Sequence, residues 1–236
     1  MKSQDYVLII FCKWPRLNQG KQRLAKTIGA SNAFRLASLL VDCALEDAKD
    51  WDGEVVLAIS DASDFEQASQ AIQKQISDNQ KISIQVQSKG NLGQRINHID
   101  QNLRERGKNN LLFIGTDAPV LNPLYYQQAK EAITSSDIVI SDASDGGVII
   151  MGNRKAWPDL TFLPWSTEKL SKKLSRICAK QRLSVTRIKP GFDIDVEKDL
   201  EKLFVAIDSD SRRSRIALRQ WLVNYLETNQ ELINAG

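Results

Sequence analysis

The sequence contains few of the residues on which thiolate, disulfide and histidine chemistry depend. Its three cysteines, Cys12, Cys43 and Cys178, lie far apart. They have neither the paired spacing of a zinc site nor the even count of a disulfide framework, so we expect core thiols in a reducing cytoplasm. The single histidine, His98, has no visible partner and does not by itself indicate a general base. Carboxylates remain the main candidates for chemistry.

The sequence also lacks a strong charge imbalance and long hydrophobic runs. Its 32 Lys and Arg residues exceed its Asp and Glu residues by only three, and they are spread along the chain. This distribution excludes a basic nucleic-acid surface. No segment approaches the roughly 20 apolar residues of a membrane-spanning helix, and the first apolar segment, Tyr6 to Cys12, lacks the features of a secretory signal. We expect a cytoplasmic protein without an integral membrane segment.

What the sequence does contain is an alternation of strand-like and helix-like segments. Short apolar runs are followed by stretches with apolar residues at helical spacing. The strand-like runs are Val7 to Phe11, Val55 to Ile59, Ile82 to Val86, Leu111 to Ile114, Ile138 to Ile140, Val148 to Met151 and a segment around Val185. This alternation predicts one α/β domain over residues 1–236, with a mainly parallel sheet and helices on both faces.

Two helices can be predicted in more detail. Asn122-Pro123 marks the start of one, because Asn suits the N-cap and Pro the first helical turn. Residues 205–236 are expected to form a helical extension, because apolar residues recur among charged ones from Arg215 to Leu232. This amphipathic helix either packs on the domain or forms a contact in a homodimer, and packing is the commoner use of an apolar stripe.

Two acidic segments follow strand-like runs. Asp117 stands directly after Leu111 to Ile114, and the pair Asp193 and Asp195 follows another run, Leu183 to Ile188. Ligands of open α/β sheets collect beyond the carboxyl ends of strands, and aspartates two residues apart on extended chain point to the same side. Their hard oxygen atoms suit Mg²⁺ or Mn²⁺ bound to a diphosphate. All three aspartates are therefore candidate metal ligands.

Each aspartate also has a purely structural interpretation. Asp117 can simply fix a turn, and Asp195 can be the N-cap of a short helix from Val196 to Phe204.

The connection after the first strand, residues 13–24, is basic. Its four cations are Lys13, Arg16, Lys21 and Arg23. In this position a loop brings backbone N–H groups and cationic side chains to the phosphates of a nucleotide. The loop has neither the G-x-x-x-x-G-K-[ST] pattern of a Walker A loop nor the dinucleotide pattern G-x-G-x-x-G. On charge alone, a solvated basic loop is the alternative.

Three further segments fit either a site or an ordinary structural role. Gly90-Asn91-Leu92-Gly93-Gln94-Arg95 lies between a strand and a helix, where glycines allow a ligand to approach the backbone. Asp145-Gly146-Gly147 joins two strand-like runs and is either a hairpin turn or a carboxylate beside accessible backbone. Trp165-Ser166-Thr167 precedes a helix expected from about Thr167 to Lys180, and Ser166 is a candidate N-cap.

Taken in order, these segments resemble a bacterial family of GT-A-like glycosyltransferases, formerly called DUF2064, in the nucleotide-diphospho-sugar transferase superfamily. The motifs that carry the resemblance are Phe11-Cys12-Lys13-Trp14-Pro15, Gly20-Lys21-Gln22-Arg23-Leu24, the three segments just described, Gly115-Thr116-Asp117-Ala118-Pro119, Asp193-Ile194-Asp195 and Asp199-Leu200. The resemblance implies a three-layer α/β/α sandwich with a Rossmann-like sheet. It places a nucleotide against the N-terminal half and an acceptor against the C-terminal half.

The resemblance also implies roles for individual residues. Lys13, Lys21 and Arg23 would meet the nucleotide phosphates, and Asp117 would take the acidic metal position. The remaining candidates on the nucleotide side are Pro15, Gly90, Gly93 and Arg95. Those on the acceptor side are Gly146, Gly147, Trp165, Ser166 and Thr167.

The sequence departs from the family pattern in the basic loop. The family usually has Pro-Gly where this chain has Leu17-Asn18, and Lys-Thr-Arg-Leu where it has Lys21-Gln22-Arg23-Leu24. We therefore expect a less tightly turned loop that lacks one hydroxyl near the phosphates.

The function expected from this resemblance is a metal-dependent transfer of sugar from a nucleotide-diphospho-sugar to an unidentified small-molecule acceptor. Asp117 and Asp145 are the candidate catalytic residues, with Asp145 activating an acceptor hydroxyl. The superfamily also contains guanylyltransferases that act on phospholactate or phosphoenolpyruvate. A nucleotidyltransferase that joins a nucleoside triphosphate to a phosphorylated small acid is therefore the alternative. A catalytically silent nucleotide-binding protein is the third possibility.

Overall fold

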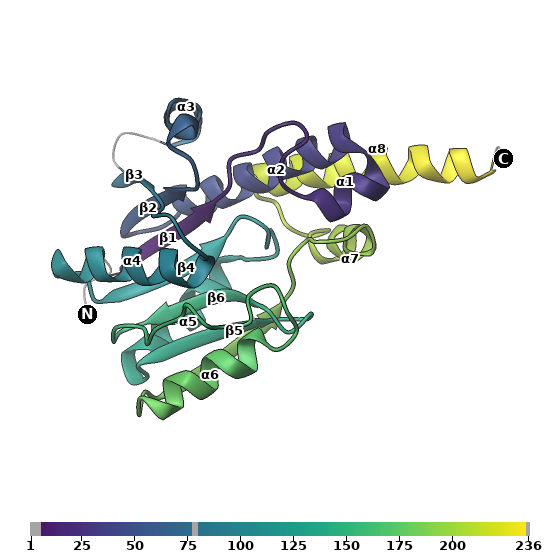
Figure 1. The fold of residues 1–236 in the computed structure, drawn as a ribbon. Coiled ribbons are helices and arrows are strands. Elements are labelled where there is room, and N and C mark those ends of the chain that lie inside the picture. The colour runs from purple at the N-terminus through teal and green to yellow at the C-terminus, as the bar shows by residue number, and fades with distance from the viewer. Residues whose placement is uncertain (1–5, 77–79, 235–236) are drawn as a thin grey trace.

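The computed structural model describes residues 6–76 and 80–234, and these residues form one seven-stranded sheet flanked by helices (Figure 1). The strands are β1 (Tyr6–Cys12), β2 (Glu54–Ile59), β3 (Ile82–Val86), β4 (Asn110–Gly115), β5 (Ile138–Ala143), β6 (Val148–Asn153) and β7 (Val185–Gly191). Their order across the sheet is β3-β2-β1-β4-β6-β5-β7. Strand β6 runs antiparallel to its neighbours β4 and β5, and the other pairings are parallel. The predicted mainly parallel sheet is confirmed.

Helices cover both faces of the sheet. They are α1 (Gln22–Ile28), α2 (Ala30–Lys49), α3 (Phe65–Gln75), α4 (Leu92–Glu105), α5 (Pro123–Ser135), α6 (Leu170–Lys180), α7 (Lys198–Ala206) and α8 (Arg213–Asn234), with a short 3₁₀ helix, η2 (Ala62–Asp64). Leu8 and Ile10 of β1 pack with α2, α3 and α5, whereas Val7 and Ile9 pack with α4 and α6. Because alternate strand residues point to opposite sides, one apolar strand contributes to both cores. The fold is the three-layer α/β/α sandwich that was expected.

The C-terminal helix α8 packs on the sandwich through its first turns. Leu218 and Leu222 are buried in a third apolar cluster with residues of α1, α2 and α7. Figure 1 shows α8 beside α2 and then extending past the rest of the fold. The predicted helix from Arg215 to Leu232 is therefore present with slightly wider bounds, whereas residues 235–236 of the proposed extension lie outside the described residues. Within the described helices, none is long and apolar enough to cross a membrane.

Helix starts agree with the prediction at α5 and differ at α6 and α7. The Asn122 side chain accepts a hydrogen bond from the Leu124 N–H at 3.1 Å, and Pro123 opens the helix, as predicted. Helix α6 begins at Leu170 instead of Thr167, with Lys169 at the N-cap. Ser166 adopts a left-handed φ of 62° three residues earlier, so the interpretation of Ser166 as the cap was wrong.

Helix α7 also starts later than predicted, at Lys198 rather than Val196, and its N-cap is Glu197. The N–H groups of Asp195 and Val196 are bound instead by the Asp199 carboxylate, at 3.0 and 2.9 Å. The Asp195 side chain is therefore not used as a cap, and the structural interpretation of this residue was wrong.

Candidate functional site

The basic loop after β1 is folded tightly despite the Leu17-Asn18 sequence. The Gln19 N–H donates to the Arg16 carbonyl at 3.0 Å, and Asn18 lies in the left-handed region with a φ of 61°. Asn tolerates this conformation better than most residues other than Gly. Asn18 therefore adopts a conformation that favours Gly, and residues 16–19 form a closed turn. The expectation that the loop is less tightly turned than in the family stays a prediction.

The four cations of this loop have different environments. Arg16 is held on η2, where its Nε lies 2.8 Å from Asp64 Oδ1 and its Nη2 donates to the Ser63 hydroxyl. Lys13, Lys21 and Arg23 line a cavity of about 570 Å³ at the carboxyl ends of β1 and β4. The loop is thus anchored by one cation and presents three to the cavity.

Lys21 links the basic loop to the acidic segments. Its Nζ lies 2.9 Å from Asp117 Oδ1 and 3.9 Å from Asp195 Oδ1, and it donates a hydrogen bond to the Ile194 carbonyl. The Lys21 side chain is only 10% exposed, whereas Asp117 is 46% exposed. Arg23 is more open at 67% exposure, with its Nη1 3.5 Å from Asp195 Oδ2. Two cations therefore border the acidic residues.

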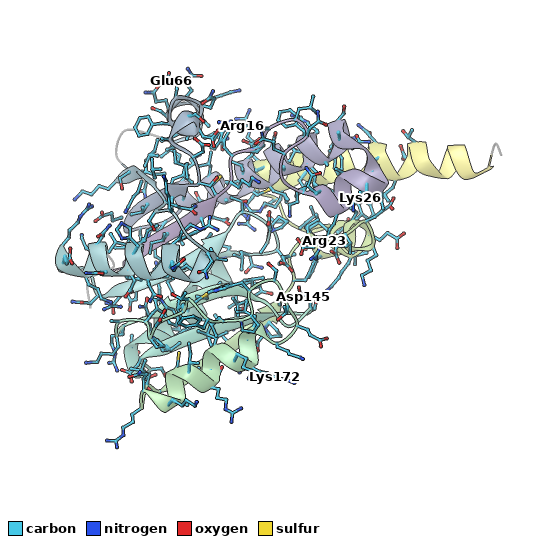
Figure 2. The ribbon with its side chains drawn as sticks, viewed as in Figure 1. Arg16, Arg23, Lys26, Glu66, Asp145 and Lys172 are labelled. Carbon is cyan, nitrogen blue, oxygen red and sulfur yellow. The ribbon has the colours of Figure 1, made fainter. Side chains whose placement is uncertain are left out.

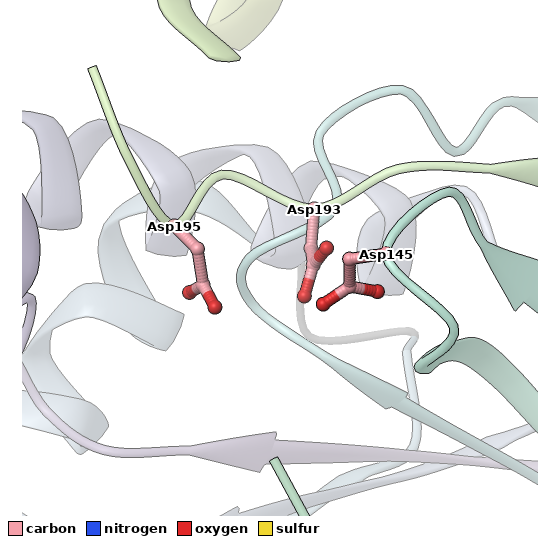
Figure 3. A group of neighbouring side chains, drawn as sticks. All are labelled: Asp145, Asp193 and Asp195. Carbon is pink, nitrogen blue, oxygen red and sulfur yellow. The ribbon is translucent and has the colours of Figure 1, made fainter. Parts of the chain in front are cut away.

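Three carboxylates form a compact acidic cluster, defined here as Asp145, Asp193 and Asp195 (Figure 3). One oxygen from each lies within 4.8 Å of the others. Asp193 and Asp195 follow β7 and extend toward the same space, as predicted, while Asp145 comes from the β5–β6 turn. Strands β5 and β7 are paired, and Ser144 N donates to the Gly191 carbonyl at 3.0 Å. This pairing brings the turn beside the late aspartates.

Asp117 is near this cluster but is not part of the close group of three. Its backbone carbonyl accepts a hydrogen bond from the Ile194 N–H at 2.9 Å, so the two acidic segments lie side by side. Its carboxylate pairs with Lys21. The ligand set predicted from the sequence was Asp117, Asp193 and Asp195. That set did not include Asp145, which the structure places beside Asp193 and Asp195.

The acidic cluster carries unfavourable like-charge interactions. Burial, together with the nearby Asp145 and Asp195 carboxylates, raises the pKa of Asp193 to about 6. Asp117 adds a smaller contribution in the same direction. Close carboxylates of this kind are stabilised by a cation, and oxygen donors match the preference of Mg²⁺ and Mn²⁺. The donor set therefore fits a hard divalent cation.

A second cavity, of about 300 Å³, adjoins the first. The two cavities share residues of the site, including Arg23, Asp117, Ser166 and Asp195. Figure 2 shows Arg23 on α1 and Asp145 on the β5–β6 turn at the same end of the sheet. Asp195 of the acidic cluster therefore lines both cavities, whereas Asp145 and Asp193 line only the smaller one.

The structure brings most of the predicted acceptor-side residues to this second cavity. Gly147, Trp165, Ser166 and Thr167 line it, whereas Gly146 does not. Gly146 has a φ of 90°, and a Cβ there would lie 2.1 Å from the Glu168 carbonyl oxygen. Its glycine is required by backbone conformation and close packing. Asp145-Gly146-Gly147 is thus both a hairpin turn and a part of the site.

On the nucleotide side, Pro15 and Arg95 line the larger cavity, but Gly90 and Gly93 line neither. Asn91 and Gln94 form a capping box at the start of α4. A Cβ on Gly93 would lie 2.1 Å from the Leu160 carbonyl oxygen, so this glycine allows α4 to pack against the segment between β6 and α6. Gly93 therefore has a packing role, and ligand contact at Gly90 and Gly93 stays a prediction.

Sequence reasoning missed two polar residues of the larger cavity, Ser60 and Gln87. Gln87 is buried, accepts a hydrogen bond from Arg95 Nη1 at 2.9 Å and donates to the Ala58 carbonyl. Ser60 and Gln87 directly follow β2 and β3. The rule that ligands gather beyond strand ends, applied to every strand, would have found both.

The cysteines are buried, as expected. Cys12 lines the larger cavity, but burial and the nearby Asp117 and Asp64 raise its pKa to about 12. Its thiol is therefore neutral near pH 7 and is a poor nucleophile.

Solved structures with the same architecture come from several bacteria. A proposed nucleotide-diphospho-sugar transferase from Desulfovibrio desulfuricans G20 has a TM-score of 0.82 at 21% identity, covering 94% of this chain and 98% of that chain. A cytidylyltransferase from Leptospira borgpetersenii has a TM-score of 0.56 at 11% identity, covering 98% and 96%. A 4-diphosphocytidyl-2C-methyl-D-erythritol synthase from Anaerococcus prevotii DSM 20548 has a TM-score of 0.54 at 12% identity, covering 94% and 99%. At these identities the similarity establishes the fold.

A search of curated proteins finds none that matches. Residues 43–167, more than half of the chain, match the model of the family described as "uncharacterized protein conserved in bacteria". The resemblance inferred from the motifs is thereby confirmed, and the chain belongs to the DUF2064 family.

Proposed function

We propose that this protein is a metal-dependent transferase that binds a nucleotide-diphospho-sugar and passes the sugar to an acceptor. The observation that carries the proposal is that two adjoining cavities share Asp117 and Asp195, beside the rest of the acidic cluster and beside Lys21 and Arg23. The larger cavity has the size and the cationic lining needed by a nucleotide diphosphate. The smaller cavity gives a second molecule access to the same carboxylates.

The residues of the larger cavity are suited to a diphosphate. Lys13, Lys21 and Arg23 supply three positive charges, and Arg23 can contact two phosphate oxygens at once. Pro15 and Arg95 also line this cavity and are assigned to the nucleotide side. As diphosphate charge grows during transfer, these preorganised cations stabilise it.

The acidic residues would hold the divalent cation. Asp193 and Asp195 are the assigned ligands, with Asp117 on the neighbouring segment. A bound Mg²⁺ or Mn²⁺ supplies electrostatic stabilisation of the diphosphate leaving group. Asp145 has an oxygen within 4.8 Å of the Asp193 and Asp195 carboxylates and also lines the smaller cavity. We therefore assign it as the general base that removes the proton of the acceptor hydroxyl.

A nucleotidyltransferase is the second candidate, because the fold is shared with the cytidylyltransferase structures. It would use the same acidic residues but take a nucleoside triphosphate and release pyrophosphate. Release of pyrophosphate from a triphosphate separates it from the sugar-transfer proposal. Saturable nucleotide binding without turnover would favour a silent nucleotide-binding protein.

The experiment that tests the proposal is a thermal-shift screen. Nucleoside mono-, di- and triphosphates and nucleotide-sugars are each added with and without Mg²⁺ or Mn²⁺. A ligand that binds only the folded state raises the melting temperature by mass action. Metal-dependent stabilisation by a nucleotide-sugar supports the proposal and identifies the donor. Preference for a triphosphate supports nucleotidyl transfer, and no shift with any ligand contradicts both.

A further inference from the structure

The smaller cavity is mostly apolar away from the acidic cluster. Its walls come from the ends of β4 and β6, from α4 and from the segment that leads into α6. The apolar side chains that define its chemistry include Phe113, Val148, Ile149, Met151, Trp165 and Leu170. Apolar surface of this kind gains free energy when a ligand displaces water from it.

Trp165 is held in place as part of this wall. Its indole Nε1 donates a hydrogen bond to the Leu160 carbonyl at 3.1 Å, which satisfies the one polar atom of the ring. The Thr167 hydroxyl also has its proton bound within the protein, because it donates a hydrogen bond to the Pro164 carbonyl at 2.7 Å. The ring therefore offers an apolar surface instead of a polar contact, and a ring or hydrocarbon face of a ligand complements it.

The charges around the cavity are almost all negative. Four aspartates line it: Asp117, Asp145, Asp193 and Asp195. Among the described residues of the lining, Arg23 is the one cation, and it already lies 3.5 Å from Asp195. Arg23, the neighbouring Lys21 and a divalent cation together would offset the four negative charges, and a bound nucleotide diphosphate would add further negative charge. A second multiply charged anion would therefore meet net repulsion, because like charges at these separations interact unfavourably.

We infer that the acceptor which enters the smaller cavity is an uncharged molecule with a hydroxyl group beside an apolar ring or chain, and not a phosphorylated small acid. This inference rests on the proposed function and names the substrate class of the same site. The hydroxyl meets the carboxylate of Asp145, and the apolar face lies on the wall that includes Trp165 and Met151. The same chemistry disfavours the phosphorylated acid required by the nucleotidyltransferase alternative.

Two probes test the inference by isothermal titration. Phenyl β-D-glucopyranoside is neutral and hydroxylated and carries an apolar ring, whereas phosphoenolpyruvate is a phosphorylated small acid. Both are titrated into protein saturated with Mn²⁺ and the nucleoside diphosphate that gives the largest thermal shift, so that the cations of the larger cavity are already occupied. We expect the phenyl glucoside to bind at least about tenfold more tightly than phosphoenolpyruvate to this loaded protein. Equal or tighter binding of phosphoenolpyruvate, or no binding of the phenyl glucoside, overturns the inference.

A charge-addition variant provides an independent measurement. Thr167→Lys places a cation on the exposed rim of the smaller cavity, and Thr134→Lys places the same cation on α5, away from both cavities. We expect Thr167→Lys to tighten phosphoenolpyruvate binding by about tenfold or more and Thr134→Lys to leave it unchanged. If both variants bind phosphoenolpyruvate like the parent, local charge does not control the choice of ligand and the inference is wrong.

These measurements separate the inference from the proposed function. Loss of the metal-dependent nucleotide binding itself contradicts the proposed function. Where that nucleotide binding is present, the order of the two probes on the loaded protein tests the chemistry of the smaller cavity by itself.

Discussion

The ammonium group of Lys21 lies 2.9 Å from a carboxylate oxygen of Asp117, and this contact joins the loop after β1 to the loop after β4. Lys21 is also held by the Ile194 carbonyl, between the two late aspartates. One lysine therefore contacts both acidic segments from the side of the larger cavity. A cation so placed balances the carboxylates and lies close to the expected position of a diphosphate.

Asp117→Ala should weaken the binding of a nucleotide with its metal by about tenfold or more. The change removes a carboxylate beside the acidic cluster and leaves Lys21 without its closest partner. Isothermal titration of the best nucleotide from the thermal-shift screen, with Mn²⁺ present, measures the effect. Circular dichroism on the same sample checks that the variant is folded. Parental affinity for nucleotide and metal in a folded variant would show that Asp117 has no part in the site.

Arg23 and Lys26 allow a comparison within one helix (Figure 2). Both are exposed on α1, but Arg23 lines both cavities and Lys26 lines neither. Arg23→Gln should reduce the affinity for a nucleoside diphosphate by about tenfold, since a hydrogen bond to a charged group contributes about 1.5–3 kcal/mol. Lys26→Gln removes the same charge and should have no effect. Similar losses of nucleotide affinity in both variants would indicate long-range attraction of the phosphates rather than direct contact with Arg23. Higher salt would then abolish the difference in affinity between each variant and the parent.

The acidic cluster predicts a pH dependence for the stability of the metal-free protein. The pKa of Asp193 is raised from 3.8 to about 6, so the folded state holds this proton more tightly than the unfolded state does. The resulting stabilisation is present below pH 4 and is lost as the pH rises through about 6. Urea unfolding between pH 4 and pH 7 measures this contribution. In Asp193→Asn, which cannot titrate at this position, the corresponding decrease in stability should be absent.

A bound divalent cation should abolish the loss of stability between pH 4 and pH 7. A divalent cation competes with the proton for the Asp193 carboxylate, so apparent Mn²⁺ affinity should rise with pH up to about 6 and then level off. A Mn²⁺ affinity that is independent of pH over this range would argue against Asp193 as a ligand.

The C-terminal helix α8 is hydrogen-bonded to the loop that contains Asp117. Arg215, which is fully buried, pairs with Asp47 at 2.8 Å and donates to the backbone carbonyls of Pro119 and Leu121 at 3.2 and 3.1 Å. Arg215→Met leaves the buried Asp47 with fewer partners, and breaking such a pair costs about 3–5 kcal/mol. We expect this loss of unfolding free energy by urea denaturation. Arg213→Met, at the exposed start of the same helix, is the control and should change stability little.

The fold was predictable because it depends on local patterns. The apolar runs of β1, β2 and β4 are nearly continuous, and all but one residue of each strand is buried, which is typical of central parallel strands. Asp117, Asp193 and Asp195 were identifiable for the same reason, since each follows a strand-like run. The rule that places ligands beyond strand ends needs only the positions of the strands.

The composition of the acidic cluster could not be predicted in this way. The position of Asp145 beside Asp193 depends on the strand order β4-β6-β5-β7, with β6 antiparallel. Strand order depends on packing between segments that are distant in the sequence, so local periodicity does not predict it. The packing role of Gly93 was not predicted for a related reason, because Leu160 is distant in the sequence and the contact leaves no local signal.

The most direct test of the central claim is whether binding of the nucleotide-sugar depends on the cation held by the acidic cluster. Isothermal titration with the donor from the thermal-shift screen would compare Mn²⁺ with chelator, in the parent and in Asp193→Asn. We predict binding at least about tenfold tighter with Mn²⁺ in the parent, and loss of that difference in the variant. Equal binding with chelator and with Mn²⁺, in both proteins, would contradict a metal-dependent transferase.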